Sequence, residues 1–206
     1  MASTYTPLGI ELQATGENAG TWGTKTNTNL QIFEQISGGF TQQSIAGGAQ
    51  TTALTVSDGS TGAVMSHRMI EFTGTITGNQ IVTIPLDTQT FYFLRNSTSG
   101  AHTVQFKYTS GSGSTFTFSA TNKGDAIIFA AANDGTNPDI KEISLTTPPA
   151  GTTGQVQVNS SGSFGAISEG TSGHILTSNG SGAAPTFQAN SGIGIGKAIA
   201  MAIVFG

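Results

Sequence analysis

The stretch from residue 11 to residue 40, ELQATGENAGTWGTKTNTNLQIFEQISGGF, carries the strongest structural signal in the chain. It contains the only tryptophan, Trp22, within a run of turn-forming residues. Apolar residues then recur at helical spacing, which predicts a short helix from about Thr26 to Ser37 with one apolar side. These apolar residues are Leu30, Ile32, Phe33 and Ile36.

The sequence leaves the start of this helix open. Thr28 followed by Gln31 has the spacing of a capping box, and Thr24 or Asn27 could equally open the helix. The end is expected at Gly38-Gly39, because glycine tolerates the left-handed conformation that often terminates a helix.

The same segment resembles the N-terminal region of tail-fibre and related virion-appendage proteins of tailed phages, especially marine ones. The resemblance covers about thirty residues and rests on Trp22-Gly23, followed by Asn27-x-Asn29-Leu30 and a short amphipathic helix. In that family this region attaches a trimeric fibre to the virion. The resemblance therefore implies virion docking by Trp22, Asn27, Leu30 and Phe33. Alternatively, Trp22 and the helix cover one end of an ordinary β-domain core, and the two interpretations are compatible.

The composition favours a β-rich protein with an uncharged polar surface. Charged residues make up 9% of the 206 residues, whereas a typical soluble domain has about a quarter. Glycine is abundant, with 29 residues, and serine and threonine are dense throughout. Such a surface is unusual for a free cytosolic enzyme, which generally depends on charge for solubility.

The charge and hydropathy patterns argue against several functional classes. The formal net charge is −4, and the seven Lys and Arg residues are scattered, so we expect no nucleic-acid partner. No apolar stretch approaches the roughly 20 residues of a membrane span. The first residues lack the features of a signal peptide, so we expect synthesis in the host cytoplasm. Localisation to the tail or head surface of a virion is what the resemblance implies. Cysteine is absent, which excludes disulfides and thiolate metal sites.

From residue 54 to residue 145, short alternating segments are separated by turns rich in glycine, asparagine and serine. This spacing predicts an all-β fold, an antiparallel β-sandwich or a small barrel. The region is similar in pattern to a small β-sandwich module of phage fibres. The predicted strands are Leu54–Val56, Met69–Ile76, Gln80–Pro85, Gln89–Arg95, His102–Tyr108, Thr115–Ser119, Ala126–Ala130 and Ile140–Leu145.

Beyond Pro148-Pro149 the chain contains an internal repeat. GTTGQVQVNSSG begins at Gly151 and GTSGHILTSNGSG begins at Gly170, nineteen residues later. Each unit is too small to bury a core alone, so we expect three chains to wind together as an intertwined β fibre-like segment. The block is similar to those in the shafts of phage tail fibres. The predicted division is a docking segment over 1–45, a β-sandwich body over 46–146, and a linker, repeat and oligomerisation segment over 147–206.

The last ten residues are almost entirely apolar, and their alternation of small and large side chains favours a strand. We expect them to bind the same segment of two other chains. A groove on another virion protein, entered by strand addition, is a second option, and a membrane contact is a third. The predicted interface residues are Ile199, Met201, Ile203, Val204 and Phe205.

No catalytic or cofactor motif is evident. GIGIGK, from Gly192, lacks the spacing of a phosphate-binding loop. His67, His102 and His174 stand singly, although three copies of His174 could meet around an ion on a fibre axis. The Asp- and Asn-rich stretch 133–139 is interpreted as an ordinary turn rather than a calcium loop.

Six aromatic residues could form a sugar-stacking platform, but their alternating spacing favours a place in the core. They are Phe91, Tyr92, Phe93, Tyr108, Phe116 and Phe118.

These observations lead to one functional expectation with two alternatives. We expect a non-enzymatic phage virion protein without cofactors, a short homotrimeric tail fibre or spike for host attachment. Its partners would be a tail hub or adaptor protein and a glycan or protein of the host surface. The first alternative is a head decoration, cement or capsid fibre protein bound to the major capsid protein. The second is a carbohydrate-binding β-sandwich module.

Overall fold

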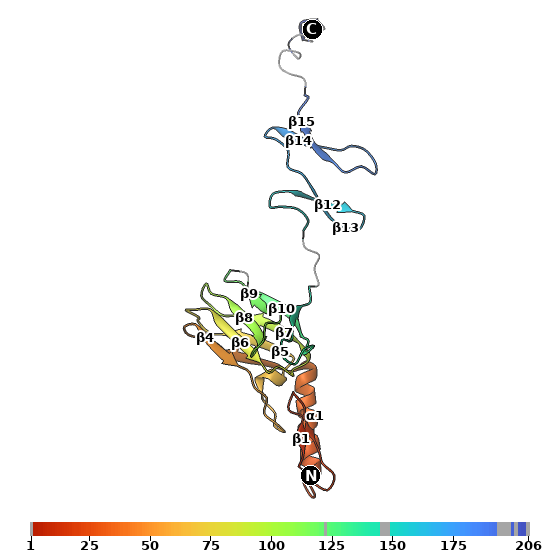
Figure 1. The fold of residues 1–206 in the computed structure, drawn as a ribbon. Coiled ribbons are helices and arrows are strands. Elements are labelled where there is room, and N and C mark those ends of the chain that lie inside the picture. The colour runs from red at the N-terminus through yellow and green to blue at the C-terminus, as the bar shows by residue number, and fades with distance from the viewer. Residues whose placement is uncertain (1, 122, 145–148, 193–198, 200–201, 205–206) are drawn as a thin grey trace. The chain divides into compact units, whose positions relative to one another are not determined.

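The computed structural model of the chain describes residues 2–121, 123–144, 149–192, 199 and 202–204. It divides into two compact units, unit 1 from Met1 to Ser144 and unit 2 from Leu145 to Gly206. The described residues are mostly β-strands with little helix, which confirms the prediction of an all-β fold (Figure 1). Each unit is described by itself.

Unit 1 begins with a small two-stranded sheet and one long helix. The strands β1 (Thr4–Tyr5) and β2 (Glu11–Leu12) pair antiparallel, and α1 spans Trp22–Gly38. The helix therefore begins four residues before the predicted start, and Thr21 occupies the N-cap position without a side-chain capping bond. Thr28 lies inside the helix and donates a hydrogen bond to the Thr24 carbonyl at 3.1 Å. The predicted capping box is therefore wrong.

The helix ends at the predicted glycines for a different physical reason. Gly39 has an extended backbone, with φ −67° and ψ 145°, and not the left-handed conformation. A Cβ atom on Gly39 would lie 2.7 Å from the Gln35 Cα atom and 2.9 Å from the His67 ring. Glycine is therefore required here by close packing, since any side chain would displace the turn from the helix.

The body of unit 1 contains a five-stranded and a four-stranded sheet. Their strand orders are β11-β10-β7-β5-β3 and β4-β6-β8-β9. Every predicted strand range except Leu54–Val56 overlaps a strand. The strands are β3 (Phe40–Ser44), β4 (Gln50–Ala53), β5 (Met69–Thr73), β6 (Gln80–Ile84), β7 (Thr90–Asn96), β8 (Val104–Tyr108), β9 (Phe116–Phe118), β10 (Gly124–Ala130) and β11 (Ile140–Glu142).

The strands from β3 to β8 alternate between the two sheets and stack in parallel. Strands β3, β5 and β7 are parallel neighbours in one sheet, and β4, β6 and β8 are parallel neighbours in the other. Each pair, β3–β4, β5–β6 and β7–β8, therefore forms one coil, and the three coils stack as in a short solenoid. Strands β9, β10 and β11 then pair antiparallel. The prediction of a wholly antiparallel body is therefore wrong.

The corners between the sheets explain several glycines. Backbone hydrogen bonds join successive corners, among them Ile76 N–H to Ser99 O at 2.9 Å. At Gly100, φ is +100° and a Cβ atom would lie 2.1 Å from the Ile76 carbonyl oxygen. At Gly78, a Cβ atom would lie 2.3 Å from the Ala49 nitrogen. The coils approach each other at these corners more closely than any side chain allows.

One hydrophobic core lies between the two sheets. Phe106 of β8 is fully buried, and its ring centroid lies 6.4 Å from that of Phe72 on β5 and 5.8 Å from that of Tyr92 on β7. The buried Tyr92 hydroxyl donates a hydrogen bond to the Met65 carbonyl at 3.0 Å, within a short 3-10 helix, η1 (Val64–Ser66). Burial raises the pKa of the Tyr92 hydroxyl. Both sheets are thus joined by aromatic contacts.

Unit 2 contains two hairpins, one for each sequence repeat. Strands β12 (Val156–Ser160) and β13 (Ser163–Ile167) form the first, and β14 (His174–Thr177) and β15 (Thr186–Ala189) form the second. The repeat positions Gly154 and Gly173 both have positive φ, +97° and +86°. Equivalent sequence positions therefore adopt equivalent turns, and each returning strand completes a two-stranded sheet.

Candidate interaction surfaces

The helix α1 exposes three large apolar side chains. Trp22, Leu30 and Phe33 are 66%, 61% and 60% exposed. At 100° per residue they fall within an arc of about 80° on one side of the helix. We call these three residues the α1 stripe. Asn27, the fourth residue assigned to docking, is also exposed on α1 and lies beside this arc.

The side of α1 next to the stripe attaches to the rest of unit 1. Ile32 is the one fully buried side chain of the helix. The Asn29 side chain pairs with the backbone of Glu11, accepting from its N–H and donating to its carbonyl, both at 2.9 Å. Sequence reasoning missed this role of Asn29, although an asparagine inside a helix is a weak signal because it disfavours helix formation.

Glu11 is the centre of a polar network between β2 and α1. Lys25 Nζ lies 3.1 Å from Glu11 Oε2, and Asn18 Nδ2 donates to Glu11 Oε1 at 2.9 Å. The hydrogen bond from Asn18, together with Lys25, lowers the pKa of the Glu11 carboxyl below its usual 4.5. The ionised carboxylate therefore stabilises the contact between hairpin and helix.

This network predicts an acid-sensitive helix attachment. Because the folded pKa of Glu11 is below 4.5, its stabilisation is present above pH 4.5 and is lost as the pH falls through the folded pKa. We expect the NMR amide shifts of β1, β2 and α1 to follow this titration in the wild type and to lose that component in Glu11→Gln. The matched control is Glu34→Gln on the exposed side of α1, which should leave the titration unchanged. An identical titration in Glu11→Gln would contradict the assignment.

The outer face of the five-stranded sheet has a row of apolar side chains across neighbouring strands. The strand register aligns Phe40 with Met69, Met69 with Phe93, and Phe93 with Ile127. Phe40 is 53% exposed, and Met69 and Phe93 are each 37% exposed. The row continues toward Ile143, whose N–H donates to the Ile127 carbonyl at 2.8 Å.

A second pair of aromatic residues extends this row along the strands. Phe91 pairs with Phe129 in the register and contacts Phe93 edge to face, with ring centroids 5.9 Å apart. The Arg68 guanidinium stacks over the Phe91 ring at 3.9 Å and donates to the Phe91 carbonyl. We call the resulting surface the apolar face; it comprises Phe40, Met69, Phe91, Phe93, Ile127, Phe129 and Ile143.

A polar row borders the apolar face. The register aligns Gln42, Glu71, Arg95 and Asp125 across four strands. Arg95 and Asp125 form a two-pronged ion pair at 2.7 and 3.0 Å. Glu71 accepts from Ser97 at 2.5 Å and from Gln42 at 2.7 Å, and these hydrogen bonds lower the pKa of its carboxyl. The charges of this row are therefore satisfied within one chain.

These positions correct the prediction that the aromatic residues form the core. Tyr92, Tyr108 and Phe118 are buried as predicted, and Phe116 packs against the core. Phe91 and Phe93 lie on the outer face of the sheet, where they are 40% and 37% exposed. Because apolar residues occupy both faces of β7, their spacing alone could not show which face is buried.

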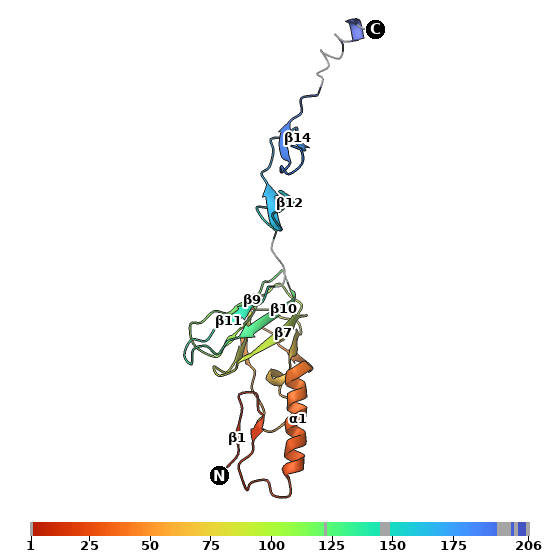
Figure 2. The same cartoon turned by 90° about the vertical axis from the view of Figure 1, so that its right-hand side faces the viewer.

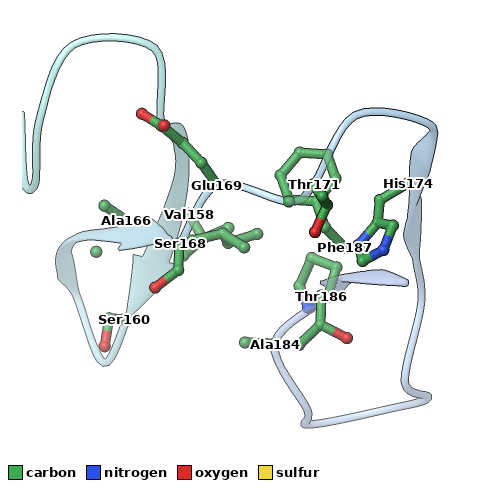
Figure 3. Close-up of a pocket in the computed structure, with 14 residues that line it drawn as sticks. Val158, Ser160, Ala166, Ser168, Glu169, Thr171, His174, Ala184, Thr186 and Phe187 are labelled. Atoms are coloured by element: carbon green, nitrogen blue, oxygen red, sulfur yellow. The ribbon is translucent and has the colours of Figure 1, made fainter. Parts of the chain in front are cut away.

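Unit 2 has a hollow of about 520 Å³ between its two hairpins. Figure 3 shows Val158 and Glu169 on one side and His174, Phe187 and Thr186 on the other. A Cβ atom on Gly170, which also lines the hollow, would lie 2.5 Å from Phe187, so the repeat's first glycine permits this close packing. The lining offers one carboxylate and one imidazole, too few ligands for a metal site.

The predicted interface residues at the end of the chain are described in part. Ile199 and residues 202–204 are helical, which contradicts the predicted strand at these positions. Ile199, Ile203 and Val204 are all exposed, and their role in an interface stays a prediction. Met201 and Phe205 lie outside the described residues.

The described residues contain no group of three or more His, Asp or Glu side chains that could bind a metal ion. Within the stretch 133–139, Asp134 accepts from the N–H groups of Thr136 and Asn137 at 2.7 and 3.1 Å, which confirms an Asx turn. Two hydrogen bonds from Ser114 lower the pKa of Asp139 to about 2. These carboxylates are thus occupied in local structure.

The surfaces with functional potential are therefore the α1 stripe, the apolar face and the two hairpins of unit 2. No helix in the described part of the chain is long and apolar enough to span a membrane. No protein-family model, curated protein or solved structure matches this chain.

Proposed function

We propose that the chain is a structural protein of a tailed-phage virion, a short homotrimeric fibre or spike for host attachment. In this proposal α1 and its hairpin attach the fibre to the particle, the two sheets of unit 1 form a β-sandwich body, and unit 2 forms an intertwined shaft with the same unit of two other chains. The resemblance of the Trp22-Gly23 and Asn27-x-Asn29-Leu30 segment to phage appendage proteins supports the virion assignment.

The observation that carries the proposal is the architecture of unit 2. Each of its sheets has two strands, and an isolated two-stranded hairpin is marginally stable in water. The hairpins nevertheless expose large apolar side chains, with Phe164 at 54%, Ile175 at 49% and Leu176 at 45%. Association with further copies would bury these side chains and supply the missing hydrophobic contacts.

The scarcity of charge is consistent with this role. With 9% charged residues and hydroxyl-rich strands, the chain is suited to forming stable contacts in an assembly. In this proposal Trp22, Leu30 and Phe33 dock to the particle. Tryptophan is among the residues that contribute most binding energy at protein interfaces, whereas leucine is under-represented among them. We therefore assign Trp22 the largest share of any docking contact.

Electron microscopy of particles of the phage that encodes the chain tests this proposal. Antibodies against unit 1 should label the tail or its tip, and preimmune serum serves as the control. Label distributed over the head would instead favour the decoration or cement alternative. Particles that contain no copy of the chain would overturn both virion assignments.

A further inference from the structure

We propose that the apolar face of unit 1 binds the apolar faces of two further copies of this chain. This inference rests on the proposed homotrimer and names the contact in unit 1 that forms it. It places the association on the side chains of β3, β5, β7 and β10 as well as on unit 2.

The geometry gives this surface continuity within unit 1. The helix ends at Gly38, and Phe40 opens β3 and the apolar row two residues later. The row then crosses the sheet through Met69 and Phe93 to Ile127 by register. Figure 2 looks onto the five-stranded sheet, and α1 extends beyond one end of it in the same view. The apolar face is therefore one continuous surface on the sheet, and the α1 stripe belongs to a different element.

The exposed area of the apolar face is large for one chain. With about 200 Å² for a large side chain, the exposed fractions give roughly 500 Å² for this face. This value lies in the upper part of the range of about 300–600 Å² found for the largest patch of a monomer, and such patches are often functional. Burial against further copies would remove this apolar area from water.

The chemistry of the surface favours another copy as the occupant. The seven residues of the apolar face carry no charge, and the bordering Glu71, Arg95 and Asp125 are paired within the chain. Lys141, which is opposite Phe129 in the register, is exposed and forms an ion pair with Asp139 at 3.6 Å. A charged partner would therefore have to compete with pairs that already exist within the chain. A glycan would need several polar groups directed toward it. The nearest cation, Arg68, is already stacked on Phe91 and bonded to Thr90 Oγ1 at 2.9 Å. The apolar face of another copy has the same uncharged chemistry and is therefore a suitable partner for this surface in a symmetric assembly.

The test is the solution mass of the full-length Phe93→Asp chain, measured by sedimentation velocity over a dilution series. Phe93 is in the middle of the row and exposed in the single chain, so the variant should fold. In the assembly the new carboxylate would be buried without a partner, and we expect association to weaken by about a hundred-fold or more. The matched control is Ile81→Asp, at a half-buried position of β6, which should assemble as the wild type does.

The outcomes separate the two proposals. A trimeric wild type with a dissociated Phe93→Asp chain supports the apolar face. A trimeric wild type whose Phe93→Asp chain remains equally trimeric overturns this surface but leaves the proposed fibre intact. A monomeric wild type overturns both the trimer and this surface, and binding of a glycan array by that monomer would identify the alternative occupant.

A second measurement covers the case in which Phe93→Asp fails to fold. The chain has no cysteine, so Met69→Cys and Ile81→Cys each provide a single reactive thiol. Maleimide labelling of the Met69→Cys chain should be slow where the protein is trimeric and should accelerate on dilution to monomers. The Ile81→Cys thiol should react at the same rate under both conditions. Equal, dilution-independent rates for both variants in a trimeric protein would overturn the proposal.

Discussion

Replacing Phe106 with alanine is expected to lower the free energy of unfolding of unit 1 by about 3–5 kcal/mol. Phe106 is completely buried and its ring contacts both Phe72 and Tyr92, which belong to the opposite sheet. The substitution removes the apolar surface that joins the two sheets and leaves a cavity between them. Urea unfolding followed by far-UV circular dichroism measures the change.

The control for this substitution is Lys107→Ala. Lys107 follows Phe106 on β8 and points to the other side of the sheet, so its removal should change the free energy of unfolding by at most about 0.5 kcal/mol. All variants must be compared at one protein concentration, because association adds to the apparent stability. An equally small effect for Phe106→Ala would show that the two sheets do not share this core.

The second large effect is expected for Ile32→Ala, which should reduce the free energy that keeps α1 attached to unit 1 by about 2–5 kcal/mol. Ile32 is fully buried, whereas the large apolar residues on either side of it in sequence, Leu30 and Phe33, are mostly exposed. Besides the Ile32 side chain, the polar contacts of Asn29 and Glu11 attach the helix. Gln35 adds two more hydrogen bonds, since its carbonyl accepts from the Arg68 N–H at 3.1 Å and its side chain accepts from the Gly62 N–H at 3.3 Å. Native-state hydrogen exchange of the α1 amides measures the loss directly.

Glu34→Ala is the matched control for the helix. Glu34 is exposed on α1, so alanine should change the protection of the helix amides by no more than about 0.5 kcal/mol. Unchanged protection in Ile32→Ala would mean that the helix is fixed mainly by the Glu11 network. In that case protonation of Glu11 at low pH should remove most of the free energy that keeps α1 attached.

The positions of the strands could be predicted from the sequence, but their partners could not. Alternation along segments such as Gln80–Ile84 shows which side chains share a face, and this pattern is the same in a hairpin and in a solenoid coil. A short Gly-Asn turn such as Gly78-Asn79 is typical of a link between neighbouring strands of one sheet. In the structure it leads from one sheet to the other, and Gly78 is required because Ala49 of the preceding coil passes close to it.

The candidate surfaces, too, could be predicted from the sequence only in part. The apolar side of the helix was evident from spacing, but Leu30, Ile32 and Phe33 have different exposures because only one narrow side of α1 contacts the body. The apolar face was not predicted, since its residues come from separate strands and meet only through the parallel register. The return strand Ser163–Ile167 of the first repeat was also missed, because its serine and glycine content is typical of a turn.

The solution mass of the full-length wild-type chain tests the central claim of self-association most directly. Light scattering coupled to size exclusion should give three times the chain mass of 20.9 kDa if the proposed homotrimer forms, because association would cover the apolar side chains that the apolar face and the hairpins of unit 2 expose. A mass of 20.9 kDa that persists at the highest soluble concentration would contradict the homotrimer and with it the proposed fibre.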